Sequence, residues 1–592
     1  KHSGVKQSNR GQISDKDFEE SVKSTLKRDK MVSVSNNNVS VTFHKPLPDD
    51  LKTFNSYFID DKMTTKNMNM FKKRILGLSS YFRDVESLMP RYIKSENFRV
   101  VKVEMSDYQL GVYEKARKEE RKMEKNNAKT KKKQMAANTG IFADTVSTYR
   151  IFSRAFCNFV FPEQIGRPLP GKNEGVSETD MIDEDDLDGL SVEEKAQNPE
   201  APFDNDDTNN TTNDADRLNQ IYKEKVAKAL VELERNKDVY LTKEALQTYS
   251  PKFLNILENV TDADHKGLHL IYSQFRTLEG IGIMKLMFEA NGFAEFRLTR
   301  KGGVWDLNIS EADMTKPKFV LYTGSETAEE KELIRNIFNG AWQYVPSSIT
   351  EKLKEIHPDN KQGDIIKVIM ITASGAEGIS LKNVRYVHIT EPYWHPVRTQ
   401  QVIGRARRIC SHQGLPIDMR TVDVFLYLMT LTEEQQKSDQ ILELRKKDKS
   451  KRIPNTPFTS DETLYEIATM KEDVTNEILR AVKESSFDCT LHAKVGGKEQ
   501  LKCFTFGSDD PAKFAYVPAF EEEDSDNVAK QNQAEITFKA KQFTMGDNSY
   551  ALDETTMNVY DLESYKIGNP VLIGKLVVSG TGEERKYELV NV

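Results

Sequence analysis

The sequence predicts an α/β fold built around a parallel β-sheet that is covered by helices on both faces. Near-continuous apolar segments alternate with amphipathic segments between residues 268 and 429. Strands that are buried on both faces read as unbroken apolar runs, and parallel strands need a long, usually helical, crossover between them. We also expect helical linker regions and a small β-rich module at the C-terminal end of the chain.

The expected elements follow in chain order. An alternating segment, Phe98–Ser106, predicts a strand with Val101, Val103 and Met105 on one face. The main strand signals lie at residues 268–275, 318–324, 365–373, 384–390 and 420–429. Helical patterns follow the first two of these, at residues 280–292 and 325–339, and the second begins with capping Ser and Thr residues.

Composition shifts divide the chain into six expected regions. Residues 166–216 are acidic and nearly without apolar periodicity, which is typical of disorder. The other regions are a flexible tail or linker at 1–40, a helical region at 41–165, the sheet domain with leading helices at 217–430, a helical brace at 431–489 and a β-rich module at 490–592.

Charge and cysteine content exclude several classes of protein. The 92 acidic residues outnumber the 85 basic ones, so any nucleic acid would bind in a local basic groove. No apolar run reaches the roughly 18 residues of a membrane span, and no cleavable signal is visible. The cysteines, Cys157, Cys410, Cys489 and Cys503, form no CxxC pair, which indicates neither a metal site nor a disulfide framework and favours a reducing compartment.

The segment QVIGRARRI, Gln401–Ile409, places three arginines directly behind an apolar strand. The planar guanidinium matches phosphate oxygens, and on a helix Arg405 and Arg408 would share a face with Gln401. Arg407 would point elsewhere, towards a salt bridge. Because open parallel sheets bind ligands at the carboxyl ends of their strands, we expect a receptor for a terminal nucleotide phosphate there. A solvated basic helix face is the alternative.

Two further loops are expected at the same edge. The loop TASGAEGISL, residues 372–381, has small residues that let backbone N–H groups approach a phosphate closely. The loop TEPYWHPVRTQ, residues 390–400, contains Trp394 and His395, which we expect to pack the loop rather than act on a ligand.

Together these segments resemble superfamily 2 helicases. VIMITASGAEGISLKNVRYVHITEPYWHPVRTQQVIGRARRICSH resembles motifs V and VI, LHLIYSQF motif IV, and YTGSETAEEKELIRNIFN the block after it. The likeness covers residues 70–165 and 245–485 and points to Swi/Snf-type DNA translocases and helicases of large nucleocytoplasmic DNA viruses. It implies a RecA-like second motor lobe, with residues 41–165 as an inter-lobe region.

The resemblance implies a role for each motif residue. Arg408 would be an arginine finger, Arg405 a companion phosphate ligand, and Gln401 would position water or phosphate. Nucleotide contact or coupling falls to Gly375, Glu377, Gly378 and Gly404, although Glu377 could instead be a structural cap. Contact with the nucleic-acid backbone falls to Ser273, Gln274, Thr323, Thr372 and Ser374.

The resemblance also implies cofactors, partners and a location. ATP and Mg²⁺ would be held mainly by a first lobe, and double-stranded DNA would be the track. The resemblance implies viral transcription or replication proteins as partners, no membrane, and an intracellular site such as a virion or viral factory. The alternatives are an RNA helicase and a non-catalytic scaffold of a viral transcription complex. The retained arginine spacing argues against a scaffold.

One element of such a motor is not found in the sequence. GRPLPGKN, Gly166–Asn173, has the glycine and lysine spacing of a P-loop, but Asn173 replaces the Mg²⁺-binding hydroxyl and no apolar strand precedes it. We therefore expect the first lobe to lie outside these 592 residues, and the chain alone to be inactive as an ATPase.

Overall fold

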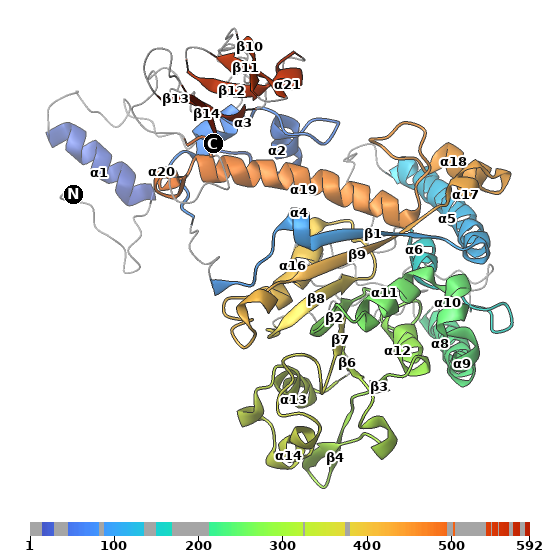
Figure 1. Ribbon diagram of the computed structural model, residues 1–592. Helices are drawn as coiled ribbons and strands as arrows, with labels where there is room; N and C mark the ends of the chain where they lie inside the picture. The colour runs from blue at the N-terminus through green and yellow to red at the C-terminus, as the bar shows by residue number, and fades with distance from the viewer. Residues whose placement is uncertain are drawn as a thin grey trace. The chain divides into compact units, whose positions relative to one another are not determined.

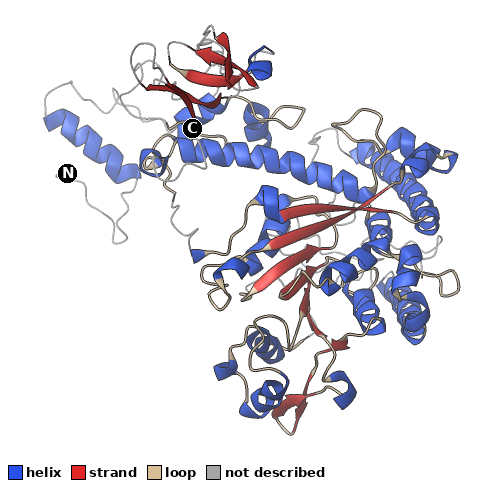
Figure 2. Cartoon of the chain, viewed as in Figure 1, coloured by secondary structure: helices blue, strands red, loops and turns tan. Residues whose placement is uncertain are grey.

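A seven-stranded parallel sheet forms the centre of the structure, which is a computed structural model (Figures 1 and 2). The strand order is β1-β9-β8-β2-β7-β6-β3, and every neighbouring pair runs parallel. The strands are β1 (Phe98–Glu104), β2 (Leu268–Tyr272), β3 (Ala294–Glu295), β6 (Lys318–Tyr322), β7 (Val368–Ile371), β8 (Val384–Ile389) and β9 (Asp423–Thr430). The predicted α/β class and all five main strands are confirmed.

The structure describes residues 15–28, 45–81, 88–134, 150–167, 212–323, 326–372, 379–493, 501–503, 540–545, 548–553, 556–566, 572–579 and 586–591. The expected acidic insert therefore lies largely outside the described residues, as does most of the P-loop-like segment. Among the described residues, no helix is both long and apolar enough to span a membrane.

Alternating side chains of the strands build two separate cores, one on each face of the sheet. On β9, Phe425 and Tyr427 point into the first core, while Val424 and Leu426 point into the second. The first core is closed by α5 (Asp107–Gln134), α6 (Ile151–Asn158), α8 (Thr212–Arg235), α10 (Lys243–Tyr249), α11 (Pro251–Thr261) and α12 (Ile281–Ala290). The second is closed by α13 (Ala328–Phe338), α14 (Ser347–Ile356) and α16 (Pro396–Ala406).

Local sequence signals fix where these helices begin. The Ser250 hydroxyl accepts from the Phe253 N–H, with Pro251 in the first turn, so α11 has the cap that its sequence predicts. Thr327 caps α13 by accepting from Glu330 N–H at 3.2 Å. The long helix α19 (Ser460–Glu484) starts with a reciprocal capping box between Thr459 and Glu462. It packs against β9, α6, α16 and α3 (Met68–Ile75), and Figure 1 shows it running alongside the β1 edge of the sheet.

Two segments differ from their expected surroundings. Phe98–Glu104, expected within a separate helical region, is the edge strand β1 and pairs in register with Val424–Thr430. Sequence separation hides this pairing, because more than 300 residues lie between the partners. Within the expected tail, residues 15–28 form helix α1 (Asp15–Arg28). The shorter helices are α2 (Leu51–Phe58), α4 (Lys94–Asn97), α9 (Lys237–Tyr240), α17 (Glu433–Lys437), α18 (Leu442–Lys447) and α20 (Cys489–Ala493).

A two-stranded hairpin lies between β3 and β6. Its strands β4 (Leu298–Lys301) and β5 (Val304–Leu307) are joined by Gly302 and Gly303, which have φ of 57° and 85°. Positive φ at both central residues is the conformation of a tight hairpin turn that only glycine adopts freely.

Residues 519–592 form a second compact unit, separate from residues 1–518. It contains an antiparallel sheet in the order β10-β11-β12-β13-β14, so the predicted β-rich C-terminal module is confirmed. Its elements are β10 (Lys541–Met545), β11 (Asn548–Asp553), β12 (Asn558–Asp561), α21 (Leu562–Lys566), β13 (Leu572–Ser579) and β14 (Lys586–Asn591).

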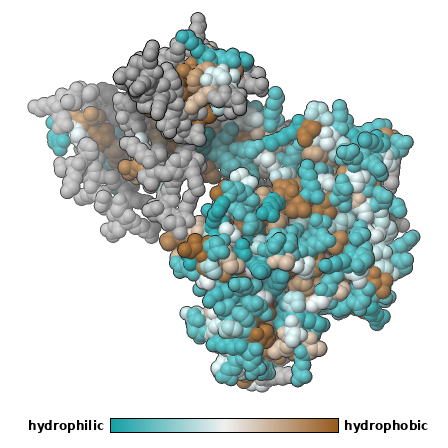
Figure 3. Space-filling model, viewed as in Figure 1, coloured by the Kyte–Doolittle hydropathy of each residue, from teal (hydrophilic) through white to brown (hydrophobic). Residues whose placement is uncertain are grey.

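The cysteine prediction is wrong in one respect. Cys489 and Cys503 form a disulfide, whereas Cys157 and Cys410 are free thiols. The two cysteines are 14 positions apart, so the bond does not appear as a CxxC motif in the sequence. On the coloured part of the face shown in Figure 3, the surface is mostly hydrophilic, with small scattered hydrophobic areas.

Candidate functional site

The helix α16 carries the arginine motif and is held on both sides. Its first turn is capped by His395, whose Nδ1 accepts from the Val397 N–H at 3.1 Å, with Pro396 next in the chain. Val402, Ile403 and Ala406 are buried against the sheet. This agrees with the expectation that His395 has a structural role in the loop.

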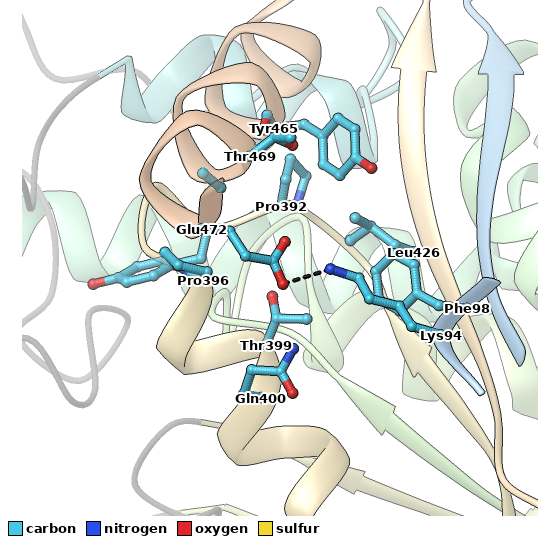
Figure 4. A pocket seen from close by; sticks show the side chains of 12 residues that line it. Lys94, Phe98, Pro392, Pro396, Thr399, Gln400, Leu426, Tyr465, Thr469 and Glu472 are labelled. Atoms are coloured by element: carbon cyan, nitrogen blue, oxygen red, sulfur yellow. Dashed lines mark hydrogen bonds and ion pairs between the residues drawn. The ribbon is translucent and has the colours of Figure 1, made fainter. Parts of the chain in front are cut away.

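On its other side, α16 faces α19 across a small pocket (Figure 4). Thr399 and Gln400 of α16 approach Tyr465, Thr469 and Glu472 of α19 there. Lys94 closes the pocket with an ion pair to Glu472 at 2.5 Å. None of the predicted site residues lines this pocket, so the pocket is not part of the predicted ligand site. The residues around it belong to the contact between α16 and α19.

The shared helix face predicted for Arg405 and Arg408 is wrong. Helix α16 ends at Ala406, and Arg407 leaves the helical conformation with φ −100° and ψ 83°. Arg408 therefore lies beyond the helix, where helical periodicity no longer applies. Its Nε donates to the Gly404 carbonyl at 3.3 Å, and its Nη1 donates to the Ser380 hydroxyl. A cation over the carbonyl end of a helix is electrostatically favourable.

The predicted position of the arginines at the carboxyl ends of the strands is also wrong. The Leu381 N–H donates to the Arg405 carbonyl at 3.2 Å, and the His412 Nε2 lies 2.8 Å from the Val384 carbonyl. Both contacts lie at the amino end of β8. An 11-residue helix rises about 16 Å, which is comparable to the length of the strand that it covers. Its last residues therefore lie beside the amino ends of the strands.

The surface beside the arginines is open at Gly404. A Cβ atom built at Gly404 would meet no other atom within 4 Å. Packing among the described residues therefore does not require glycine here, although glycine lowers helix stability. Gln401, one turn earlier on the helix, is half-buried. The open space at Gly404 and the Arg408 guanidinium, whose Nε donates to the Gly404 carbonyl, have the chemistry and the room to accept a phosphate.

Arg407 and Cys410 have structural surroundings. The Arg407 guanidinium lies over the Tyr92 ring, 5.4 Å from its centroid. Cys410 has a φ of 60°, and its N–H donates to the Leu88 carbonyl at 2.8 Å. Both residues thus join the arginine segment to residues 88–92. Arg407 thus points away from Arg408's partners, as expected, but its contact is an aromatic ring and not the expected salt bridge.

The loop between β7 and β8 links the two edges of the sheet. It starts at Thr372, which is fully buried at the carboxyl end of β7, and arrives at Ser380, beside Arg408. Four predicted residues of this loop, Ser374, Gly375, Glu377 and Gly378, lie outside the described residues. In the strand order β2 lies between β7 and β8, so this connection joins two strands that are not neighbours.

The predicted nucleic-acid ligands gather at the carboxyl edge, but most of their side chains are buried. The Ser273 hydroxyl lies 3.1 Å from both carboxylate oxygens of Glu391, and the Thr323 hydroxyl donates to Glu326 at 3.0 Å. Thr372 is also fully buried. The Ser273 and Thr323 hydroxyls are thus already paired with carboxylates, and direct phosphate contact by the three residues stays a prediction. Gln274 is half-buried and is the most accessible of the described group.

The sequence analysis missed the polar cluster behind this edge. Glu391, Asn158, Lys252 and Asp461 are each at most 1% exposed. Lys252 Nζ lies 2.9 Å from Asn158 Oδ1 and 2.5 Å from Asp461 Oδ2. Burial raises the pKa of Glu391, while the Gln274 N–H and the nearby Lys252 ammonium lower it. The available signal was Glu391 following directly on an apolar strand.

Comparison with known protein families identifies the central part of the sheet domain. Residues 314–410 match the model described as the helicase conserved C-terminal domain. The chain therefore contains a helicase C-terminal domain. This segment runs from just before β6 to the end of the arginine motif and includes the β7–β8 loop.

The relatives of this helicase domain are viral helicases and related factors. A "Putative ATP-dependent RNA helicase" of Acanthamoeba polyphaga mimivirus is 28% identical over 507 residues, covering 80% of this chain and 54% of that protein. A "Termination factor NPH-I homolog" of African swine fever virus is 29% identical over 280 residues, covering 43% of this chain and 35% of that protein. The chain thus spans about half of the mimivirus relative.

Solved structures with some likeness include two ATPase domains. The C-terminal part of the Fun30 ATPase domain is 14% identical with a TM-score of 0.30, covering 66% of this chain and 99% of that one. The Sulfolobus solfataricus SWI2/SNF2 ATPase core in complex with dsDNA is 14% identical with a TM-score of 0.22, covering 65% and 49%.

Proposed function

We propose that this chain supplies the second motor lobe of an ATP-dependent superfamily 2 DNA helicase or translocase. The observation that carries the proposal is the arrangement around Gly404. An open backbone surface lies there beside Arg405 and Arg408, and Arg408 is held by Ser380 of the β7–β8 loop. Thr372, where that loop begins, lies at the carboxyl ends of the strands, and Ser380 lies beside Arg408.

In this proposal Arg408 is the arginine finger and Arg405 its companion. Their fixed positive charges would stabilise the charge that develops on the transferred phosphoryl group. Such an arginine contributes roughly 10³–10⁵ in rate. At about 1.4 kcal/mol per tenfold, this corresponds to about 4–7 kcal/mol of the barrier. Bound ATP with Mg²⁺ would supply the phosphoryl group, with ADP as the leaving group. Gln401 would orient the attacking water.

The proposal assigns the remaining contacts of the nucleotide to a first lobe. The P-loop-like sequence GRPLPGKN has Asn173 in place of the Mg²⁺-binding hydroxyl and no apolar run before it, so in this proposal these 592 residues alone would not hydrolyse ATP. The same proposal assigns nucleic acid to the carboxyl edge, with Gln274 and the β7–β8 loop as its contacts. Viral transcription or replication proteins are the proposed partners, which the kinship with a viral termination factor homolog supports.

The neighbouring arginines provide a matched test. In the intact protein, Arg408→Ala should lower nucleic-acid-stimulated ATP hydrolysis by roughly 10³-fold or more, and Arg408→Lys should recover little because it lacks the planar fork. Arg407→Ala is the control, since its guanidinium packs on Tyr92, and we expect a change of only a few-fold. Equal effects of the two alanine variants would overturn the proposed role of Arg408.

Gly404→Ala gives an independent test of the open surface. Apart from the adjoining helix backbone, the methyl group would meet no described atom within 4 Å, so the free energy of unfolding should rise by about 0.5–1 kcal/mol. ATP hydrolysis by the intact protein should nevertheless fall, because the methyl group occupies space assigned to the nucleotide. An active, stabilised variant would contradict the assignment of this surface.

The alternative of an RNA helicase rests on the similarity to the putative ATP-dependent RNA helicase of the mimivirus. Stimulation of ATP hydrolysis by single-stranded RNA, well above that by duplex DNA, would favour it. A non-catalytic scaffold would show no response to either nucleic acid and no effect of Arg408→Ala.

A further inference from the structure

The turn that follows β2 has an unusually constrained backbone. Glu279 has a φ of 51°, a conformation that residues other than glycine rarely adopt. A Cβ atom at Gly280 would lie 1.9 Å from the Phe275 carbonyl oxygen, so only glycine fits there. The Ile281 N–H donates to that same carbonyl at 3.0 Å. The turn therefore holds one shape, and Gln274 lies at its start.

Two buried carboxylates hold this turn from opposite sides. Glu391 Oε1 accepts the Gln274 N–H and, at 3.1 Å, the Ser273 hydroxyl. Glu279, which belongs to the turn, pairs with Arg167 through contacts of 2.6 and 3.1 Å. Both carboxylates are 1% exposed. Strained backbone conformations persist only where the surroundings over-determine them, and they are common at functional sites.

Asn158 connects the two sides. Its Nδ2 donates to the Glu279 carbonyl and to Glu391 Oε2, both at 3.1 Å. Its Oδ1 accepts from Lys252 Nζ at 2.9 Å. Asn158 is the last residue of α6, which is not part of the sheet, and it is fully buried. Every polar atom of this one amide side chain is thus used to tie α6 and α11 to the turn.

We propose that Asn158 and Glu391 are positioning residues that set the Ser273–Gln274 turn in the conformation that presents Gln274 to a nucleic-acid backbone. This inference rests on the proposed function. It adds a route by which the helical region before the sheet controls the nucleic-acid edge, since the Asn158 amide of α6 contacts both Glu391 and the Glu279 carbonyl.

Exchanging the two functional groups tests the inference. Glu391→Gln places an N–H group against the Asn158 N–H, and Asn158→Asp places a carboxylate against Glu391. The double variant, Asn158→Asp with Glu391→Gln, restores one N–H···O bond in the reverse direction and keeps the net charge. The Gln274 N–H and the Ser273 hydroxyl can still use the amide oxygen at position 391.

Binding is measured by fluorescence anisotropy with a short labelled duplex DNA and, separately, a single-stranded RNA. Each single variant should weaken binding by about tenfold or more. The double variant should bind more tightly than either single variant, although less tightly than wild type, because Asn158→Asp also removes the donor to the Glu279 carbonyl. In a Gln274→Ala background, Asn158→Asp should have no further effect. A role in stability alone would not produce that loss of effect.

Hydrogen exchange of the peptide containing residues 273–282 provides a readout that needs no nucleic acid. Exchange should be faster in each single variant and partly restored in the double variant. Glu391→Asp, which keeps the charge but shortens the side chain, replaces any single variant that does not fold. Wild-type affinity and wild-type exchange in the folded single variants would overturn the positioning role. If the wild-type chain bound neither nucleic acid, the proposed function itself would fail, whatever the exchange result.

Discussion

Individual side chains at this site are governed by burial more than by residue type. Ser273, Thr323 and Thr372 are polar residues at strand ends, as a phosphate site would require, yet all three are buried. A buried hydroxyl that lost its hydrogen-bond partner inside the protein would lower the free energy of unfolding by about 1–3 kcal/mol. Rotating these side chains out to a ligand would therefore reduce stability. The partly exposed Gly404, where an added Cβ atom would find open space, and the half-buried Gln274 are the groups that we propose for a ligand.

Buried histidines should make stability depend on pH, and besides His388 and His412 they include His269, whose pKa burial also lowers. Burial lowers the pKa of His388 to about 3 and that of His412 to about 4. An unfolded histidine titrates near pH 6.5, so below that pH the unfolded chain binds protons that the folded chain does not. The free energy of unfolding should therefore fall by about 1.4 kcal/mol per pH unit for each histidine between pH 6.5 and its folded pKa.

Urea unfolding at pH 7.5 and pH 5 measures this effect. His412→Gln removes one of these groups, so its loss of stability over that interval should be about 2 kcal/mol smaller than in wild type. His357→Gln, at a half-exposed position, is the control and should behave as wild type. An unchanged pH dependence in His412→Gln would show that this histidine does not carry the effect.

At the scale of elements, the sequence signals for helix starts are local and the structure bears them out at α11 and α13. The end of α16 is different. Nothing in QVIGRARRI shows that the helix stops at Ala406, and the residue that matters most, Arg408, lies just beyond it. A helix end depends on the contacts that the following residues make. Here the Cys410 N–H donates to the Leu88 carbonyl, and the His412 ring contacts the Val384 carbonyl.

Two threonine caps of unequal burial give a prediction at this scale. Thr327→Ala removes an N-cap bond from α13 and should cost about 1 kcal/mol of unfolding free energy. Thr459→Ala removes the cap of α19 and also strands the buried Met429 carbonyl, to which the Thr459 hydroxyl donates at 2.6 Å. We expect about 2–4 kcal/mol for this variant. Equal losses in urea unfolding would refute the contribution of the second bond.

At the scale of the whole domain, a buried ion pair fastens the long helix α19 to the first core. Lys252 of α11 and Asp461 of α19 are both 0% exposed, and Asp461 Oδ2 also accepts the Met429 N–H at 3.0 Å. Such a pair links two segments more than 200 residues apart. Its net contribution is small, but either partner alone is a buried, uncompensated charge.

Lys252→Met should therefore lower the free energy of unfolding by roughly 3–5 kcal/mol. Adding Asp461→Asn to that variant removes the uncompensated charge and should recover a large part of the loss. Thermal unfolding of the two variants and of wild type measures the difference. A double variant that is less stable than Lys252→Met would contradict this account of the pair.

The sequence by itself determined the parallel sheet, its main strands, the helix starts, the β-rich C-terminal module and the helicase motifs. These follow from short-range patterns: apolar runs, caps and motif spacing. Only the tertiary structure decided that β1 completes the sheet and that the arginines lie at the amino end of β8. It also decided that Asn158, Lys252 and Asp461 form a buried polar cluster with Glu391. Each of these depends on contacts between residues distant in sequence, which are selected by packing and by the need to pair buried polar groups.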